Sequence, residues 1–75
     1  MEYKVDLAEL RAAMGRKNLN IQSLSEKMGV SRYTVAIVLD GKNPSYAFMT
    51  KAIVALELSS DDVTRIFFAP YLRTA

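Results

Sequence analysis

Few side chains in this sequence could carry out catalysis. Histidine and cysteine are absent from its 75 residues, which excludes imidazole and thiolate metal ligands, cysteine nucleophiles and the serine–histidine type of triad. Asp61 and Asp62 are adjacent carboxylates, but neighbouring positions of a helix point apart, so their expected role is negative charge at a helix start. The sequence therefore predicts a binding protein rather than an enzyme, with no cofactor and no metal.

The basic residues are concentrated in the middle of the chain. The whole chain has ten Lys and Arg against eight Asp and Glu, a net charge of +2. Residues 11–51 hold seven of the bases and two of the acids, a net charge of +5, and the remainder sums to −3. A locally basic surface attracts phosphate groups, so this distribution favours a nucleic-acid partner.

Apolar spacing and capping residues predict helices throughout. Apolar side chains recur at helical intervals, and each interval follows a residue type that commonly caps helices. The expected caps are Asp6, Asn20, Ser31, Ser45, and Ser59 or Ser60. The expected helices are 6–17, 21–28, 32–39, 46–56 and 60–68.

The length and composition predict one domain, residues 1–75. Hydrophobic residues make up 51% of the chain, which is typical of a globular protein. A core this small, without disulfides, depends on well-packed helices or on oligomerisation. The residues expected in the core are Leu24, Val35, Val38, Ile53 and Leu56, and Ile21 shares the inward face of Leu24.

Residues 21–39 have the pattern of a helix-turn-helix. Leu24 and Met28 face inward from the first helix, Gly29 permits a sharp turn, and Val35 and Val38 bury the second helix. A loop with the sequence Gly-Lys-Asn-Pro-Ser follows at 41–45, and further helices follow at 51–56 and from 58–63. Together these segments resemble the Cro/CI (Xre-type) family, which includes small repressors and modulators of phages and mobile elements.

The resemblance implies a compact all-α bundle of five helices, of the lambda-repressor-like type. It implies a sequence-specific transcriptional regulator that binds double-stranded operator DNA, often as a homodimer. Arg32 has the chemistry to hold a guanine through two hydrogen bonds, and Tyr33 and Ile37 could touch a thymine methyl. The positions that match the family's base contacts are Ser31, Arg32, Tyr33 and Ile37. Those that match its phosphate contacts are Asn20, Thr34, Lys42 and Asn43.

The outward face of the second helix leaves another function open. At about 100° per residue, Tyr33, Ala36 and Ile37 point away from the buried seam, and an exposed apolar face is typical of a protein interface. The family commonly has polar residues where this sequence has Ile21, Ile37 and Leu39. The alternative is an antirepressor that uses the same fold, with Ser31, Arg32 and this face as partner contacts, to bind a co-encoded repressor protein.

The sequence also bears on oligomerisation and on location. Phe68, Tyr71 and Leu72 exceed what one helix face can bury, so they are a candidate homodimer surface. No apolar run approaches the roughly 18–20 residues of a membrane span, and the first residues lack the pattern of a signal peptide. We therefore expect no membrane partner and a cytoplasmic location.

Overall fold

The computed structural model describes residues 5–69, and every regular element within that range is helical. The elements are α1 (Leu7–Arg16), α2 (Ile21–Met28), α3 (Arg32–Leu39), α4 (Tyr46–Leu56), α5 (Ser60–Val63) and the π-helical turn η1 (Thr64–Phe68), which continues α5. The predicted all-α fold with five helices is confirmed. The first helix begins one residue later and ends one residue earlier than predicted, because Asp6 and Lys17 cap it.

Each α-helix is preceded by a residue whose side chain accepts a hydrogen bond from the backbone N–H three residues further on. Such a cap pairs an N–H group that a helix start leaves without a partner, and it contributes about 1 kcal/mol. At α2 and α5 the bond is reciprocated, because Ser23 and Asp62 accept from the backbone N–H of Asn20 and Ser59. The caps are Asp6, Asn20, Ser31, Ser45 and Ser59.

A left-handed glycine ends α2 and determines the direction of α3. Gly29 has a φ of 74°, and the N–H of Val30 donates to the carbonyl of Ser25 at 3.0 Å. Glycine adopts this backbone conformation without the penalty that a side chain imposes. Ser31 then caps α3, so α2 and α3 follow each other through a short turn and pack together.

A single apolar cluster forms the core and draws on α1, α2, α3, α4 and η1. Its most deeply buried large side chains are Leu10, Leu24, Val35, Leu56, Ile66 and Phe67. Four of the five residues predicted in the core are buried, and the exception is Ile53, which is half-buried at the edge of the cluster. The inward face of α4 is centred on Phe48, Ala52 and Leu56, and Ile53 lies one residue, or about 100°, beyond Ala52.

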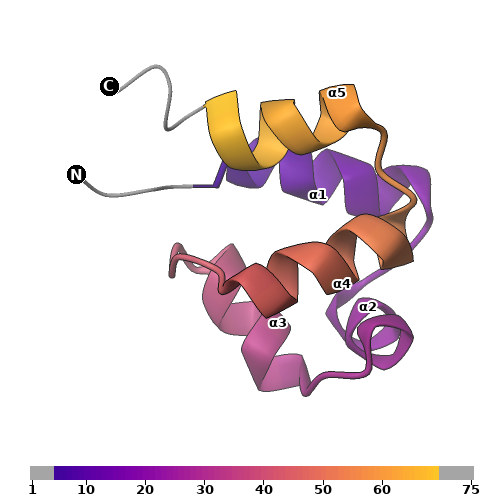
Figure 1. Cartoon of the computed structure of the whole chain (residues 1–75). Helices are drawn as coiled ribbons and strands as arrows, with labels where there is room; N and C mark the ends of the chain where they lie inside the picture. Colours follow the sequence, from indigo (N-terminus) through magenta and orange to yellow (C-terminus); the bar gives the residue numbers. More distant parts are fainter. Residues whose placement is uncertain (1–4, 70–75) are drawn as a thin grey trace.

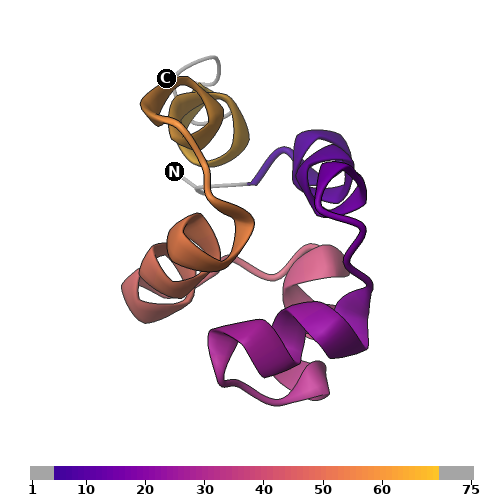
Figure 2. The same cartoon turned by 90° about the vertical axis from the view of Figure 1, so that its right-hand side faces the viewer.

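The helices form two groups, and α4 connects one group to the other along the chain. Figure 1 shows α1 beside α5 at one end and α2 and α3 at the other end, and Figure 2 shows α4 beside α2, against which it packs. The backbone N–H of Asp6 donates to the carbonyl of Ile66 at 2.8 Å, which holds the start of α1 against η1. Within residues 5–69, no helix combines the length and the apolar character that crossing a bilayer requires.

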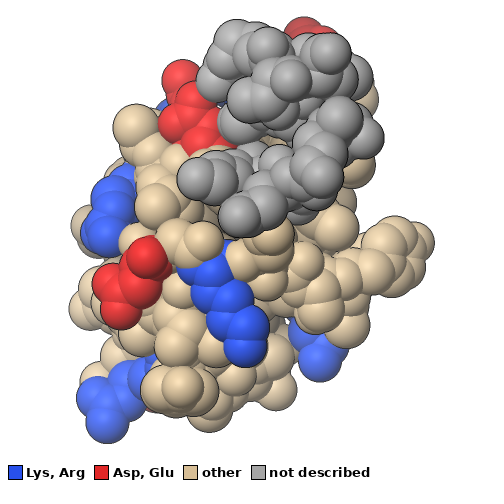
Figure 3. Space-filling model, turned by 90° about the vertical axis from the view of Figure 1, so that its left-hand side faces the viewer, with Lys and Arg blue, Asp and Glu red and all other residues tan. Residues whose placement is uncertain are grey.

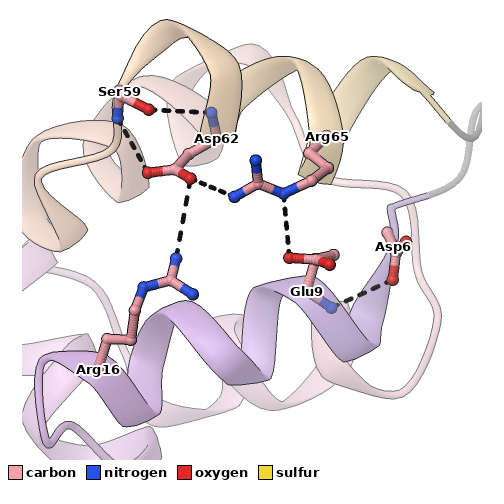
Figure 4. A network of polar contacts seen from close by, with 6 residues as sticks. All are labelled: Asp6, Glu9, Arg16, Ser59, Asp62 and Arg65. Carbon is pink, nitrogen blue, oxygen red and sulfur yellow. Dashed lines mark hydrogen bonds and ion pairs between the residues drawn. The ribbon is translucent and has the colours of Figure 1, made fainter.

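A polar network links α1 to the last helical segment (Figure 4). Arg65 Nε donates to Glu9 Oε1 at 3.2 Å, and the same guanidinium is paired with Asp62. Arg16 lies 3.9 Å from that Asp62 carboxylate. Each exposed ion pair contributes little energy on its own, and together these contacts join α1 to both α5 and η1.

The fifth predicted helix, 60–68, is only partly α-helical. The N–H of Ala69 donates to the carbonyl of Thr64, five residues earlier, which is the hydrogen-bond pattern of a π-helix. The wider turn accommodates Ile66 and Phe67, adjacent residues that are both fully buried. The predicted fifth helix over 60–68 is therefore present, as an α-helix over Ser60–Val63 that continues as a π-helical turn over Thr64–Phe68.

Candidate nucleic-acid interface

A shallow, largely apolar depression lies between the N-terminal turns of α2 and α3. Ile21 and Ala36 are half-buried in it, and Tyr33 stands at its side with 73% of its surface exposed. The depression is lined by Asn20, Ile21, Gln22, Arg32, Tyr33 and Ala36. It brings together residues that sequence analysis assigned to two separate groups, the base contacts and the phosphate contacts.

Arg32 is the charged residue of this depression, and its guanidinium is available to a ligand. It is the first residue of α3 and is exposed. Within residues 5–69, it forms neither a hydrogen bond nor an ion pair. A guanidinium presents donors in a planar fork that matches two acceptors on one base or phosphate.

Two amide side chains supply further donors beside Arg32. Asn20 Oδ1 accepts from Ser23 N at 2.8 Å, so the cap fixes the side chain, which is exposed, and its amide NH₂ donates no hydrogen bond within residues 5–69. Gln22 is exposed, and its Nε2 donates weakly to Glu26 Oε2 at 3.3 Å. The interface therefore has more hydrogen-bond donors than the outward face of α3 alone suggests.

Ser31 and Thr34 are bonded to each other in the cap of α3. Their hydroxyl oxygens lie 2.9 Å apart, and Ser31 Oγ accepts from Thr34 N at 3.1 Å. Ser31 is exposed and Thr34 is half-buried. Their evident structural role is to start α3, and any contact with a ligand must be made with the hydrogen-bonding capacity that remains.

Lys42 and Asn43 lie in the loop after α3 and do not line the depression. Both are exposed, and the N–H of Lys42 donates to the carbonyl of Ile37 at 3.0 Å, which ties the loop to the end of the helix. Gly41, with a φ of 110°, makes the turn possible. Because the eight residues of α3 span about 12 Å, the loop and Arg32 lie at opposite ends of the helix.

The predicted apolar outward face of α3 is less exposed than expected. Tyr33 is exposed, but Ala36 and Ile37 are half-buried. Leu39, at a position that the family resemblance led us to compare with a polar residue, is buried in the core. Its carbonyl lies 3.5 Å from the Arg11 guanidinium, a long contact between α1 and the end of α3.

The basic middle of the chain is partly neutralised by acids from outside it. Arg16 pairs with Asp62, and Lys17 lies 3.3 Å from Glu57. Lys27, Arg32, Lys42 and Lys51 have no ion-pair partner among residues 5–69. On the side that carries the loop between α3 and α4, Lys and Arg side chains lie apart from one another on a largely uncharged surface (Figure 3).

Sequence analysis did not identify Gln22 as an interface residue, and it identified only one of the two roles of Ile21. Ile21 was assigned to the core, and it does pack against the core cluster, but it also lines the depression. Gln22 could have been found from its place in the first turn of α2, two residues after the cap. What the sequence does not provide is the crossing of α2 and α3, which places Gln22 near Arg32.

The candidate homodimer surface is described at one residue. Phe68, at the end of η1, has 44% of its surface exposed. Tyr71 and Leu72 lie outside the described residues. The homodimer therefore stays a prediction.

Comparison with known proteins adds no assignment to this geometry. No protein-family model, no curated protein and no solved structure matches the chain.

Proposed function

We propose that the protein is a sequence-specific DNA-binding transcriptional regulator, and that α2 and α3 form its helix-turn-helix. The observation that supports this most strongly is the shared surface of Asn20, Gln22, Arg32 and Tyr33, on which Arg32 has no partner within residues 5–69. A helix whose first turn presents a free guanidinium and neighbouring amides fits the major groove of B-DNA, where base edges offer matching acceptors.

In this arrangement Arg32 contacts a base edge, and Lys42 and Asn43 contact a phosphate. The roughly 12 Å length of α3 is close to the width of the major groove, about 12 Å. Residues at its two ends are therefore spaced to contact a base and the bordering backbone. Such a regulator represses by occupying a promoter, and we propose a cytoplasmic location for it, in keeping with this function.

The test compares Arg32→Ala with Lys42→Ala on a duplex selected from a randomised pool. Fluorescence anisotropy is measured over a range of salt concentrations. Arg32→Ala should cost about 1–3 kcal/mol and relax the preference at one base pair. Lys42→Ala should weaken binding to all sequences alike and reduce the salt slope by about 1.

Lys51→Ala, which removes an exposed lysine from α4, is the matched control. Wild-type binding by both test variants would contradict the proposal.

A second candidate function is supported by the exposure of Tyr33. An aromatic ring beside an apolar depression suits the anchor of a protein interface, as in an antirepressor bound to a co-encoded repressor. A complex between the two proteins that persists at high salt and is lost in Tyr33→Glu would favour this function, because apolar burial is poorly screened. A salt-sensitive DNA complex, with no repressor binding, would favour the first.

A further inference from the structure

The depression between α2 and α3 combines an apolar floor with a polar rim. Ile21 and Ala36 are half-buried and carry no polar side-chain atom, and the ring of Tyr33 flanks them. Arg32, Asn20 and Gln22 surround this floor. A ligand group that fits here is small and apolar, and it lies directly beside a hydrogen-bond acceptor for Arg32.

The major groove of DNA offers that combination at particular base steps. Guanine presents N7 and O6 to an arginine fork, and the 5-methyl group of thymine is the apolar group of the groove edge. A thymine beside a guanine therefore places a methyl group and two acceptors next to each other. Cytosine and uracil lack the methyl group, and 5-methylcytosine has it.

We propose that this depression takes the 5-methyl group of a pyrimidine adjacent to the guanine that Arg32 contacts. The inference rests on the proposed DNA-binding function and adds the base step that the protein selects. Arg32 supplies the hydrogen bonds, and Ile21, Tyr33 and Ala36 supply the apolar contact. The tyrosine hydroxyl and the two amides remain outside the methyl contact, where they can reach phosphates.

The expected size of the effect follows from the burial of one methyl group. Removing a methyl from an apolar contact costs about 0.8 kcal/mol, which is about a fourfold change in affinity. An effect of this size is measurable, and replacing thymine with deoxyuridine produces it without changing any hydrogen bond of the base pair.

The experiment begins with a duplex selected by the wild-type protein from a randomised pool. Each thymine adjacent to a guanine is then replaced, one at a time, by deoxyuridine, and dissociation constants are measured by anisotropy. We expect a three- to fivefold loss at one such position. Tyr33→Ser should bind the thymine and deoxyuridine duplexes equally well. Tyr46→Ser should keep the discrimination, because Tyr46 is a similarly exposed tyrosine, at 79%, that does not line the depression.

Further duplexes distinguish the two sources of the methyl group. The same position is built with cytosine·guanine and with 5-methylcytosine·guanine. Binding that is restored by methylation makes methylated cytosine a ligand as well as thymine, and binding restored by thymine alone limits the site to thymine.

Three results would overturn the inference. The first is that deoxyuridine has no effect at any position. The second is that the loss is the same in wild type and Tyr33→Ser, because the methyl group would then be read elsewhere. The third is that no duplex is selected at all, which refutes the proposed function and the inference with it, whereas the first two leave DNA binding intact.

Discussion

Glu26 places a carboxylate beside the donors of the candidate interface. It lies one helical turn after Gln22 on α2 and accepts the weak hydrogen bond from that amide. It is one of two acids within residues 11–51. A negative charge in this position repels a phosphate backbone and also keeps Gln22 from turning toward a ligand.

If the proposed function is correct, Glu26→Gln should therefore strengthen binding to DNA. At low salt we expect an increase of about two- to fivefold, since a single exposed charge is worth about 0.5–1 kcal/mol near a charged ligand, and the gain should shrink as salt screens it. Anisotropy titrations at two salt concentrations measure it. Asp61→Asn, an exposed carboxylate on α5, controls for the change in net charge; an equal gain in both variants would show that Glu26 has no local effect.

The Asp62 carboxylate makes stability depend on pH. A hydrogen bond from the Ser59 backbone, with further help from the Ser59 hydroxyl and Arg65, lowers the pKa of Asp62 below its ordinary value of 3.8, although desolvation opposes the shift. Because the folded-state pKa is the lower one, the contribution to stability is fully present above 3.8 and is lost as pH falls through the folded-state value.

Asp62→Asn should accordingly melt below wild type at pH 7, and the difference in Tm should close as pH is lowered beneath 3.8. Thermal melts followed by circular dichroism across this range measure it. A difference in Tm that stays constant down to the lowest pH would show that the ionised carboxylate contributes nothing. Arg65, whose pKa is raised first by its hydrogen bond to Glu9 and then by Asp62, stays charged throughout.

At the scale of the helices, the start of each one could be predicted from the sequence because the cause is local. Asp6, Asn20, Ser31 and Ser45 each bond to a backbone N–H three residues away, and Gly29 acts through its own φ. The π-helical turn could not be predicted, since the apolar spacing of Val63, Ile66 and Phe67 suits an α-helix equally well and the choice depends on packing against α1.

Two glycine substitutions should change stability in opposite directions. A Cβ at Gly29 or at Gly15 meets no atom within 4 Å. The backbone conformation alone therefore determines how each substitution changes stability. Gly29→Ala should lower the free energy of unfolding by about 1 kcal/mol, because φ is positive there. Gly15→Ala, near the end of α1, should raise it by about 0.5 kcal/mol through helix propensity. Urea unfolding of the two variants tests the pair, and a stable Gly29→Ala would disprove the left-handed turn.

Considered as a whole, the molecule has one small core in which each large side chain matters. Leu24 is 1% exposed and belongs to the cluster that α1, α2, α3, α4 and η1 share. Leu24→Ala should cost about 2–5 kcal/mol, a large part of the total for a domain of this size. Val54→Ala, at an exposed position of α4, should change stability by less than about 0.5 kcal/mol. Equal melting temperatures for both variants would contradict the packing.

The candidate site was predictable only in part, because it depends on how the helices pack in the whole molecule. Arg32 and Tyr33 could be identified from the helix-turn-helix pattern. The presence of Ile21 and Gln22 beside them could not, because it depends on how α2 crosses α3. The pairing of Arg16 with Asp62 joins residues 46 positions apart, and that of Lys17 with Glu57 joins residues 40 positions apart. The net charge of residues 11–51 therefore overstated the basic surface.

The π-helical turn has a consequence for insertions and deletions. A π-turn holds one residue more than the α-turn it replaces, so deleting Thr64, which is exposed, would allow the segment to rewind as an α-helix. Because the deleted residue is the extra one of the π-turn, the residues after it would keep their angular positions about the helix axis, and Phe68 would stay on the same face. α2 and α3, at the other end of the molecule, would keep their sequence and their caps. An in-frame deletion of one codon at this position would thus preserve both the surface around Phe68 and the depression beside Arg32.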